Sequence, residues 1–293
     1  LKNQTFYGNE IVANTRRMCL MNMYLHNIGE IDGESFINPN DALISDDGER
    51  YDYVLANPPF GKKSSMTFTN EQGEIIKEDL SYNRQDFWET TSNKQLNFLQ
   101  HIKTQLKITG EAAVVLPDNV LFEGGAGEEV RKQLLKTTEL HTILRLPTGI
   151  FYAQGVKANV LFFNNKSASK APWTKDIWFY DYRTNVHHTP KKSPMRQEHL
   201  NEFIDLYNGK NINKREETWS EEYEEGRWRK YTYDEIIARD KTSLDIFWLK
   251  DKSLTDLDNL PDPDILANEI IENIESGLNS FREIMETING ESE

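Results

Sequence analysis

The chain has 293 residues, of which 37% are hydrophobic and 28% charged, with a formal net charge of −14 at pH 7 and one cysteine. This composition supports a sizeable core, excludes an internal disulfide framework and argues against a cysteine-based zinc site, so we predict no metal site. No apolar run approaches the roughly 20 residues that span a bilayer, which excludes a membrane-spanning segment and favours a cytoplasmic protein.

The first predicted elements alternate between strand and helix. A short strand is expected over residues 5–10, a helix over 15–27 with Met18, Met21 and Leu25 at helical spacing, and a strand over 35–37. The next strand, over 51–56, runs directly into Asn57-Pro58-Pro59-Phe60. Two consecutive prolines must end a strand, since they cannot donate to the sheet.

The alternation continues beyond a polar segment. Residues 61–92 show weak periodicity and are predicted to be a long functional loop. An amphipathic helix is expected over 93–108, with Gly110 at its end, and an apolar run over 112–117 is typical of a buried parallel strand. A helix near 127–138 and strands over 141–146, 160–163 and 177–180 follow. This order predicts an α/β fold with a mostly parallel sheet.

The end of the chain differs in character. Residues 196–240 are highly charged and are predicted to be largely helical, and a further helix is expected to begin at Asp262-Pro263. Its apolar residues form a heptad seam: Ile271, Ile274, Leu278, Phe281, Met285 and Ile288. We therefore predict a domain over 1–185, a charged extension over 186–261 and a helix over 262–293. The seam is expected to contact either a partner helix or the chain's own domain.

Asn57-Pro58-Pro59-Phe60 carries the clearest chemistry. In an open α/β sheet, ligands bind beyond the carboxyl ends of the strands, where this segment lies. An exocyclic purine amine is a poor nucleophile because its lone pair is conjugated with the ring. The Asn57 side-chain oxygen and the Pro58 carbonyl could accept its two N–H groups, and the Phe60 ring could stack on a flipped-out base. The simpler interpretation is that these residues only end a strand with a turn.

The motif resembles the catalytic motif of adenine N6 methyltransferases, and longer stretches resemble the methylation subunits of type I restriction–modification systems. Those stretches are Glu10–Ile28, Thr91–Leu96, Val115–Gly125 and Leu144–Phe151. The resemblance covers roughly residues 5–165 and weakens toward 250. It implies a Rossmann-like methyltransferase fold, with a sheet incomplete at its N-terminal edge and a helical C-terminal extension.

The resemblance also implies S-adenosylmethionine as the methyl donor. Glu10 would bind the ribose hydroxyls and Asp41 the adenine of that cofactor, with Ala42 and Asn57 lining the same site; Pro58, Pro59 and Phe60 would complete the catalytic motif. Simpler roles for Glu10 and Asp41 are a helix-start charge and a turn residue. The family's Gly-rich cofactor loop has no counterpart here, since Gly124 and Gly125 follow a different strand. The chain alone is therefore expected to be inactive.

The family resemblance implies particular partners. These are DNA, bound through a complex, a specificity subunit, a second methylation subunit and a restriction subunit with endonuclease and translocase activities. The net charge of −14 agrees with a separate DNA-reading subunit, because affinity for DNA comes largely from phosphate neutralisation. Two alternatives stay open: a methyltransferase acting on protein glutamine or RNA, and a non-catalytic module that binds the specificity subunit.

Overall fold

The computed structural model describes residues 5–30, 33, 35–61, 65–69, 75–79, 81–151, 156–191 and 193–252. The chain divides into two compact units, Leu1–Leu249 and Lys250–Glu293. All of the described helices and strands belong to the first unit. The predicted heptad helix over 262–293 lies outside the described residues.

The helices and strands follow one another along the chain in an α/β order. The strands are β1 Gly8–Asn9, β2 Ile37–Asn38, β3 Tyr51–Ala56, β4 Ser65–Thr69, β5 Ile75–Asp79, β6 Leu106–Pro117, β7 Thr138–Arg145, β8 Ala158–Asn165, β9 Asp176–Asp181 and β10 Trp228–Thr232. The α-helices are α1 Ala13–Leu25, α2 Lys94–Gln105, α3 Asn119–Phe122, α4 Ala126–Thr137, α5 Asn201–Tyr207 and α6 Tyr233–Ile237. Three short 3-10 helices are η1 Gln197–Leu200, η2 Ile212–Lys214 and η3 Asp240–Thr242.

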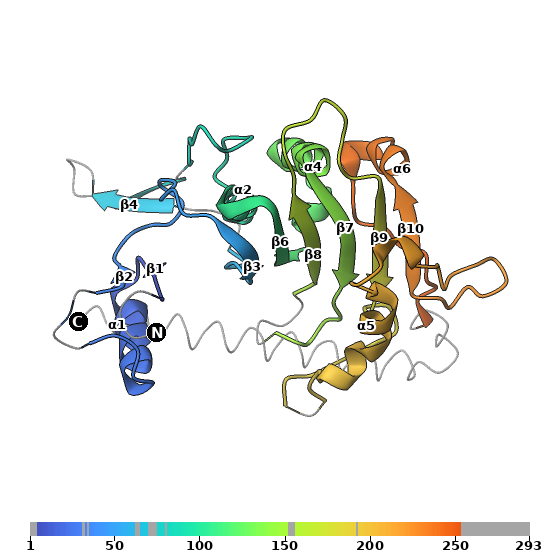
Figure 1. Ribbon diagram of the computed structural model, residues 1–293, viewed down its shortest axis with the longest axis horizontal. Helices are drawn as coiled ribbons and strands as arrows, with labels where there is room; N and C mark the ends of the chain where they lie inside the picture. The colour runs from blue at the N-terminus through green and yellow to red at the C-terminus, as the bar shows by residue number, and fades with distance from the viewer. Residues whose placement is uncertain are drawn as a thin grey trace, which may run out of the picture. The chain divides into compact units, whose positions relative to one another are not determined.

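The main sheet has six strands in the order β10-β9-β7-β8-β6-β3 (Figure 1). β3 is parallel to β6, and β7 is parallel to β9. β8 is antiparallel to both β6 and β7, and β10 is antiparallel to β9. It follows that β3, β6, β7 and β9 all run in one direction. The predicted α/β fold is confirmed; the sheet is mixed, with four of its six strands in one direction but three of its five pairings antiparallel.

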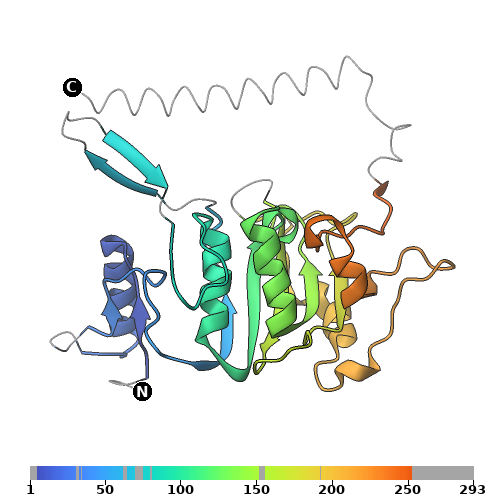
Figure 2. The same ribbon diagram turned by 90° about the horizontal axis from the view of Figure 1, so that it is seen from above.

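Each face of the sheet has its own core. Helices α2, α4 and α6 lie on one face, with α2 and α4 side by side, whereas α5 lies on the other (Figures 1 and 2). The strands supply both cores by alternation: in β9, Phe179 packs with the first group of helices, and Trp178 and Tyr180 pack toward α5. Successive side chains of a strand point to opposite faces, so apolar runs are buried on both sides. This packing fixes the carboxyl ends of β3, β6 and β7 at one edge.

The boundary between α2 and β6 differs from the prediction. The helix ends at Gln105 and the strand begins at once, so Gly110 lies inside β6 rather than at a helix end. A side chain on Gly110 would lie 2.9 Å from the Tyr51 carbonyl oxygen, which explains the glycine by close strand approach. The register of β3 against β6 shifts at this point, between Tyr51 and Tyr53.

Two further expectations are corrected, whereas the helix predicted over 15–27 is present as α1. Residues 61–92 contain the antiparallel pair β4–β5 rather than only a loop. The segment 196–240, predicted to be largely helical, contributes strand β10 to the main sheet. In α1, the apolar residues at helical spacing are exposed, with Met18 71% and Leu25 82% accessible. Among the described residues, no helix is both long and apolar enough to cross a membrane.

Candidate functional site

Asn57-Pro58-Pro59-Phe60 directly follows β3, as the sequence predicts. Pro58 is buried, whereas Asn57 is exposed. Within the described part of the chain, the Asn57 side chain has no hydrogen-bond partner. Its amide is therefore free to bind a ligand at the edge where β3, β6 and β7 end.

Asn57, Pro58 and Pro59 line a cavity of about 420 Å³, here called the edge cavity. Its other walls come from β3, from helix α2 and from the segments around β1 and β2. The lining residues include Tyr7, Gly8, Asn9, Ala42, Asp47, Tyr51, Val54, Leu55, Ala56, Phe98, His101, Ile102 and Gln105. A space of this size falls within the range of about 300–1,000 Å³ that is typical of small-molecule sites.

Phe60 lines a second cavity of about 470 Å³, here called the aromatic cavity. Two further exposed rings, Phe122 and Phe247, also line it, with 44% and 63% of their surface accessible. The cavity also has polar lining residues, namely Gln95, Asp118, Asn119, Lys157 and Asp245. Exposed aromatic faces beside a few polar groups suit a planar heterocycle.

Helix α2 holds the motif in place. The Phe60 carbonyl accepts a hydrogen bond of 2.6 Å from Gln95 Nε2, and Gln95 Oε1 accepts one of 2.8 Å from Asn119 Nδ2. Asn93 caps the same helix by accepting from the backbone N–H groups of Gln95 and Leu96. The Phe60 ring meets Phe151 edge to face, with centroids 5.1 Å apart. Phe60 is thereby held by contacts with α2 and with Phe151.

The other predicted cofactor residues lie in different surroundings. Glu10 Oε1 accepts a 2.7 Å hydrogen bond from the Val12 backbone N–H, at the start of α1. Asp41 accepts from the Leu43 N–H at 2.9 Å and from the Tyr82 hydroxyl at 2.8 Å, so both of its carboxylate oxygens have protein partners. Ala42 lines the edge cavity, while the acidic residue found there is Asp47.

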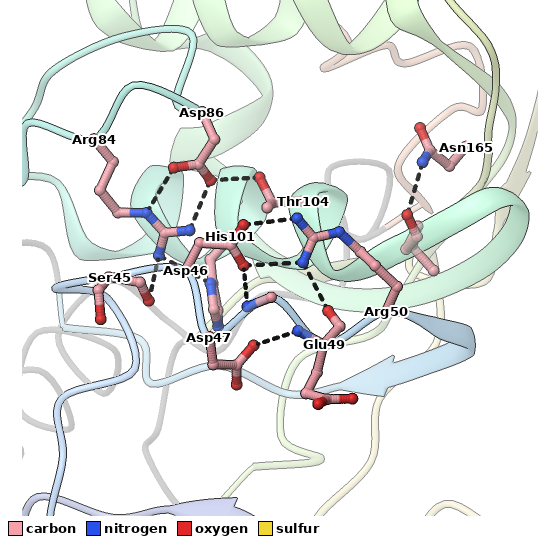
Figure 3. Close-up of polar contacts among 12 residues, drawn as sticks. Ser45, Asp46, Asp47, Glu49, Arg50, Arg84, Asp86, His101, Thr104 and Asn165 are labelled. Carbon is pink, nitrogen blue, oxygen red and sulfur yellow. Dashed lines mark hydrogen bonds and ion pairs between the residues drawn. The ribbon is translucent and has the colours of Figure 1, made fainter.

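A polar cluster centred on Arg84 links the segment that contains Ala42 and Ser45 to α2 (Figure 3). Arg84 Nη1 donates to the carbonyls of Ala42 and Ser45, both at 3.4 Å. Arg84 also binds both carboxylate oxygens of Asp86, at 2.9 and 2.6 Å, and Thr104 donates to Asp86 at 2.6 Å. Bidentate pairs of this kind fix orientation as well as charge.

The same guanidinium sets the state of His101. Arg84 Nη1 lies 3.1 Å from His101 Nδ1. Because a guanidinium can only donate, Nδ1 must accept, which leaves the imidazole proton on Nε2. Burial, followed by the charge of Arg84, lowers the pKa of His101. His101 is therefore neutral near pH 7 and lines the edge cavity as a hydrogen-bond donor.

Two ion pairs brace the aromatic cavity. Arg183 binds Asp118 through two hydrogen bonds of 2.6 and 2.8 Å, and Asn159 donates to the same carboxylate at 2.8 Å. Although burial acts to raise it, the Arg183 contact holds the pKa of Asp118 below its ordinary value. Across the cavity, Arg145 Nη2 lies 3.0 Å from Asp245 Oδ1, and burial raises the pKa of Asp245 despite that charge.

Sequence reasoning did not single out several of these residues. Arg84, His101, Asp245 and Phe247 have no motif of their own, and each reaches the site from a distant part of the chain. The segment 244–248 is bound to the sheet through Arg145, which donates to the Ile246 carbonyl and lies 4.0 Å from the centre of the Phe247 ring. Arg84 and Arg145 are both buried, and only that burial, which is known from the structure, signals their role.

The sequence is similar to proteins of one family. Residues 1–245 match the family described as N-6 DNA Methylase. The type I restriction enzyme EcoKI methylase subunit of Escherichia coli K12 is 40% identical over 320 residues, covering 99% of this chain and 58% of its own length. The StySJI methylase subunit of Salmonella typhimurium is 40% identical over 312 residues, covering 97% of this chain and 56% of its own length.

Solved structures agree with the sequence relatives. The crystal structure of the type I restriction enzyme EcoKI M protein matches with a TM-score of 0.67 and 39% identity, covering 97% of this chain and 60% of that one. A modification subunit of a putative type I restriction enzyme from Vibrio vulnificus matches with a TM-score of 0.57 and 25% identity, over 86% of this chain and 49% of that one. The chain thus spans little more than half the length of the curated relatives it matches.

Proposed function

Since this chain belongs to the N-6 DNA methylase family, among the methylation subunits of type I restriction enzymes, we propose that it takes part in methyl transfer from S-adenosylmethionine to N6 of adenine in DNA. One observation carries the proposal. The motif Asn57-Pro58-Pro59-Phe60 stands between two cavities, with its first three residues lining one and Phe60 lining the other. A methyl donor in the edge cavity and an adenine base in the aromatic cavity would meet at Asn57.

Asn57 and Pro58 act on the adenine amine. The Asn57 side-chain oxygen accepts one N–H of the amine and the Pro58 carbonyl accepts the other. Both bonds favour a pyramidal nitrogen, whose lone pair is then free to attack. The fixed φ angles of Pro58 and Pro59 hold the carbonyl in place, so little reorganisation is needed during the reaction.

The edge cavity is suited to the cofactor. Its volume of about 420 Å³ fits a small molecule, it adjoins Asn57, and it combines apolar walls with the Asp47 carboxylate and the His101 imidazole. When bound, S-adenosylmethionine supplies an activated methyl group on a positively charged sulfur. We propose that Ala42 and Asn57 contact the cofactor. Glu10 and Asp41 stay candidates for its ribose and adenine, and each would have to exchange a protein hydrogen bond for a ligand one.

The aromatic cavity is suited to the flipped base. Enzymes that modify a base inside a duplex rotate it into a pocket and hold it by stacking and by hydrogen bonds to its edge. Phe60 offers a ring that α2 and Phe151 hold in position. Gln95, Asn119 and Asp245 lie around the same space and are candidates to bind the base edge.

The proposed complex supplies most of the contacts to DNA phosphates, because this chain has a net charge of −14. We propose a specificity subunit, a second methylation subunit and a restriction subunit as partners, in the cytoplasm. One solved relative, with a TM-score of 0.60 and 25% identity, comes from a study of complex assembly in a type I restriction–modification system. The heptad seam over 262–293 is the candidate contact with the specificity subunit. If its deletion leaves co-purification with that subunit unchanged, the contact lies elsewhere.

The Asn57→Ala variant tests the proposed role of the motif. In the assembled enzyme, loss of one positioned acceptor should lower the methylation rate by a factor of about 10²–10³, as for other preorganised polar groups. Cofactor affinity, measured by calorimetric titration, should fall far less than the methylation rate, because the Asn57 oxygen acts on the adenine amine while Asn57 is only one of several residues that line the proposed cofactor cavity. The exposed Asn14, in α1, gives a matched control as Asn14→Ala. A near-normal methylation rate in the Asn57 variant would remove the proposed role.

A further inference from the structure

A third cavity lies at the opposite edge of the sheet from Asn57. Its walls come from the first residues of β7 and β9, from the end of β8 and from η2, and its volume is about 420 Å³. β7 has eight residues and runs away from this edge toward the catalytic one. At about 3.3 Å per residue, the two edges are on the order of 20 Å apart. This far-edge cavity is therefore separate from the proposed methylation site.

The charges around the far-edge cavity oppose those of the whole chain. Its lining includes the cations Lys166, Lys175, Arg215 and Lys230 and the acids Glu139 and Asp176. Lys166 is paired with Glu139 at 2.5 Å. Three cations then face one acid, in a chain with a net charge of −14. The Glu217 carboxylate accepts a hydrogen bond of 2.8 Å from the Lys230 backbone N–H, but Glu217 is not among the residues that line the cavity.

Arg215 gives a second, independent indication of a ligand. Its side chain is only 7% exposed. Nε donates to the Tyr207 carbonyl at 2.6 Å and Nη1 donates to the Thr142 hydroxyl at 3.0 Å. Nη2 is buried and has no hydrogen-bond partner among the described residues. A buried charged donor without an acceptor is costly, and Arg215 lines the cavity, so an anion bound there is a candidate partner for its guanidinium.

The remaining lining is neutral or aromatic. His141 is 5% exposed, and burial followed by the charge of Arg215 lowers its pKa to about 4, so it is uncharged near pH 7. The rings of Trp173 and Trp178 also line the cavity, and Lys166 and Lys230 lie 5.6 and 5.9 Å from their respective centres. The indole faces offer an apolar wall to any organic part of a ligand.

We propose that the far-edge cavity binds a small, multiply charged phosphate anion, either free or esterified to a small molecule. The three cations that are not paired with Glu139 outnumber the acid Asp176 by two, which favours an anion with more than one charge, and the cavity is large enough for two phosphoryl groups. Lysine and arginine together are the usual protein partners of phosphate oxygens. A DNA phosphodiester could supply the same chemistry, and a titration with a DNA duplex distinguishes that source from a small anion.

The test is calorimetric titration of the assembled enzyme with inorganic pyrophosphate, without cofactor or methylation substrate. Lys175 and Lys230 are exposed, so Lys175→Gln and Lys230→Gln should fold normally. Each should weaken pyrophosphate binding at least tenfold. Lys170→Gln removes the same charge from an exposed position outside the cavity and should bind as the wild type does. Quenching of tryptophan fluorescence on binding, reduced by Trp173→Phe, gives a second readout.

Each outcome decides the proposal. Weakening confined to the two cavity lysines supports it, and equal weakening by Lys170→Gln overturns it, because the binding would then follow overall charge. The absence of measurable pyrophosphate binding also overturns it. In a parallel titration with a DNA duplex, an effect of the cavity lysines on DNA alone would assign the cations to a DNA phosphodiester and reject a small anion. None of these results depends on methyl transfer.

Discussion

At the residue scale, Phe60 and Asn57 have different roles in the proposed site. Phe60 faces the aromatic cavity and is held there by the Gln95 hydrogen bond and by Phe151, whereas Asn57 faces the edge cavity with a free amide. The two residues belong to one four-residue stretch, so the motif itself could be predicted. The residues that support it could not, because Gln95, Phe151 and Asp245 come together only when α2, the β7–β8 connection and the segment after η3 pack around one space.

Phe60→Ala should weaken capture of the flipped base. Stacking of a base on an aromatic side chain is worth about 1–3 kcal/mol, which corresponds to roughly a 5- to 150-fold loss. A duplex with 2-aminopurine at the target position reports base flipping through its fluorescence, without any methylation. The fluorescence increase seen with the wild-type enzyme should fall with Phe60→Ala and be largely kept with Phe60→Trp. An unchanged signal in Phe60→Ala would show that another ring holds the base.

His101 should make folding stability depend on pH in a specific window. Burial and Arg84 lower its pKa in the folded state, whereas the unfolded chain has an ordinary histidine pKa near 6.5. The unfolded state therefore binds the proton more tightly, and stability is lost as pH falls below about 6.5 toward the folded-state pKa.

Urea unfolding of wild type and His101→Asn at pH 8 and pH 5 measures this effect. The loss of unfolding free energy between the two pH values should be smaller in the variant, because it has no imidazole to protonate. Asp118 and Asp86 also have lowered pKa values, but they lose their contributions at lower pH, near and below the ordinary aspartate range. An identical pH dependence in both proteins would contradict the Arg84–His101 assignment.

At the element scale, the strands could be predicted where they are buried on both faces. β6, β8 and β9 contain continuous apolar runs, which indicate a covered strand whatever its neighbours are. β10 was missed because Trp228, Lys230 and Thr232 alternate with Arg229 and Tyr231, and that mixed composition also suits a helix. It is an edge strand of the main sheet, and only its pairing with β9 reveals it.

Gly110 shows why the α2–β6 boundary could not be placed from sequence. A glycine after an amphipathic helix is typical of a helix end, yet here it admits the β3 backbone. Gly110→Ala should destabilise the fold by about 1–3 kcal/mol, since the new Cβ would lie 2.9 Å from the Tyr51 carbonyl oxygen and the strands would have to separate.

Thermal unfolding measures the effect, with Gly61→Ala as the control. A Cβ at Gly61 would meet no atom within 4 Å, so that variant should unfold near the wild-type temperature. If Gly110→Ala were as stable as Gly61→Ala, the close approach of β3 and β6 at Tyr51 would be wrong.

At the scale of the whole molecule, the chain joins an acidic overall charge to a methyltransferase fold. The charge of −14 explains why DNA binding is proposed to depend on other subunits. The chemistry proposed for the motif would suit any planar nitrogen, so the substrate class is what separates the proposed DNA methyltransferase from an RNA or protein-glutamine methyltransferase. A purely structural module would differ from all three in transferring no methyl group.

The most direct measurement supplies the assembled enzyme with S-adenosylmethionine carrying a labelled methyl group and with DNA, RNA and protein substrates in parallel. Mass spectrometry of the digested products then identifies the methylated atom. We expect N6-methyladenine in DNA alone, lost in Asn57→Ala and kept in Asn14→Ala. Label on RNA or on a protein glutamine, or methylated DNA that does not depend on Asn57, would contradict the proposed function.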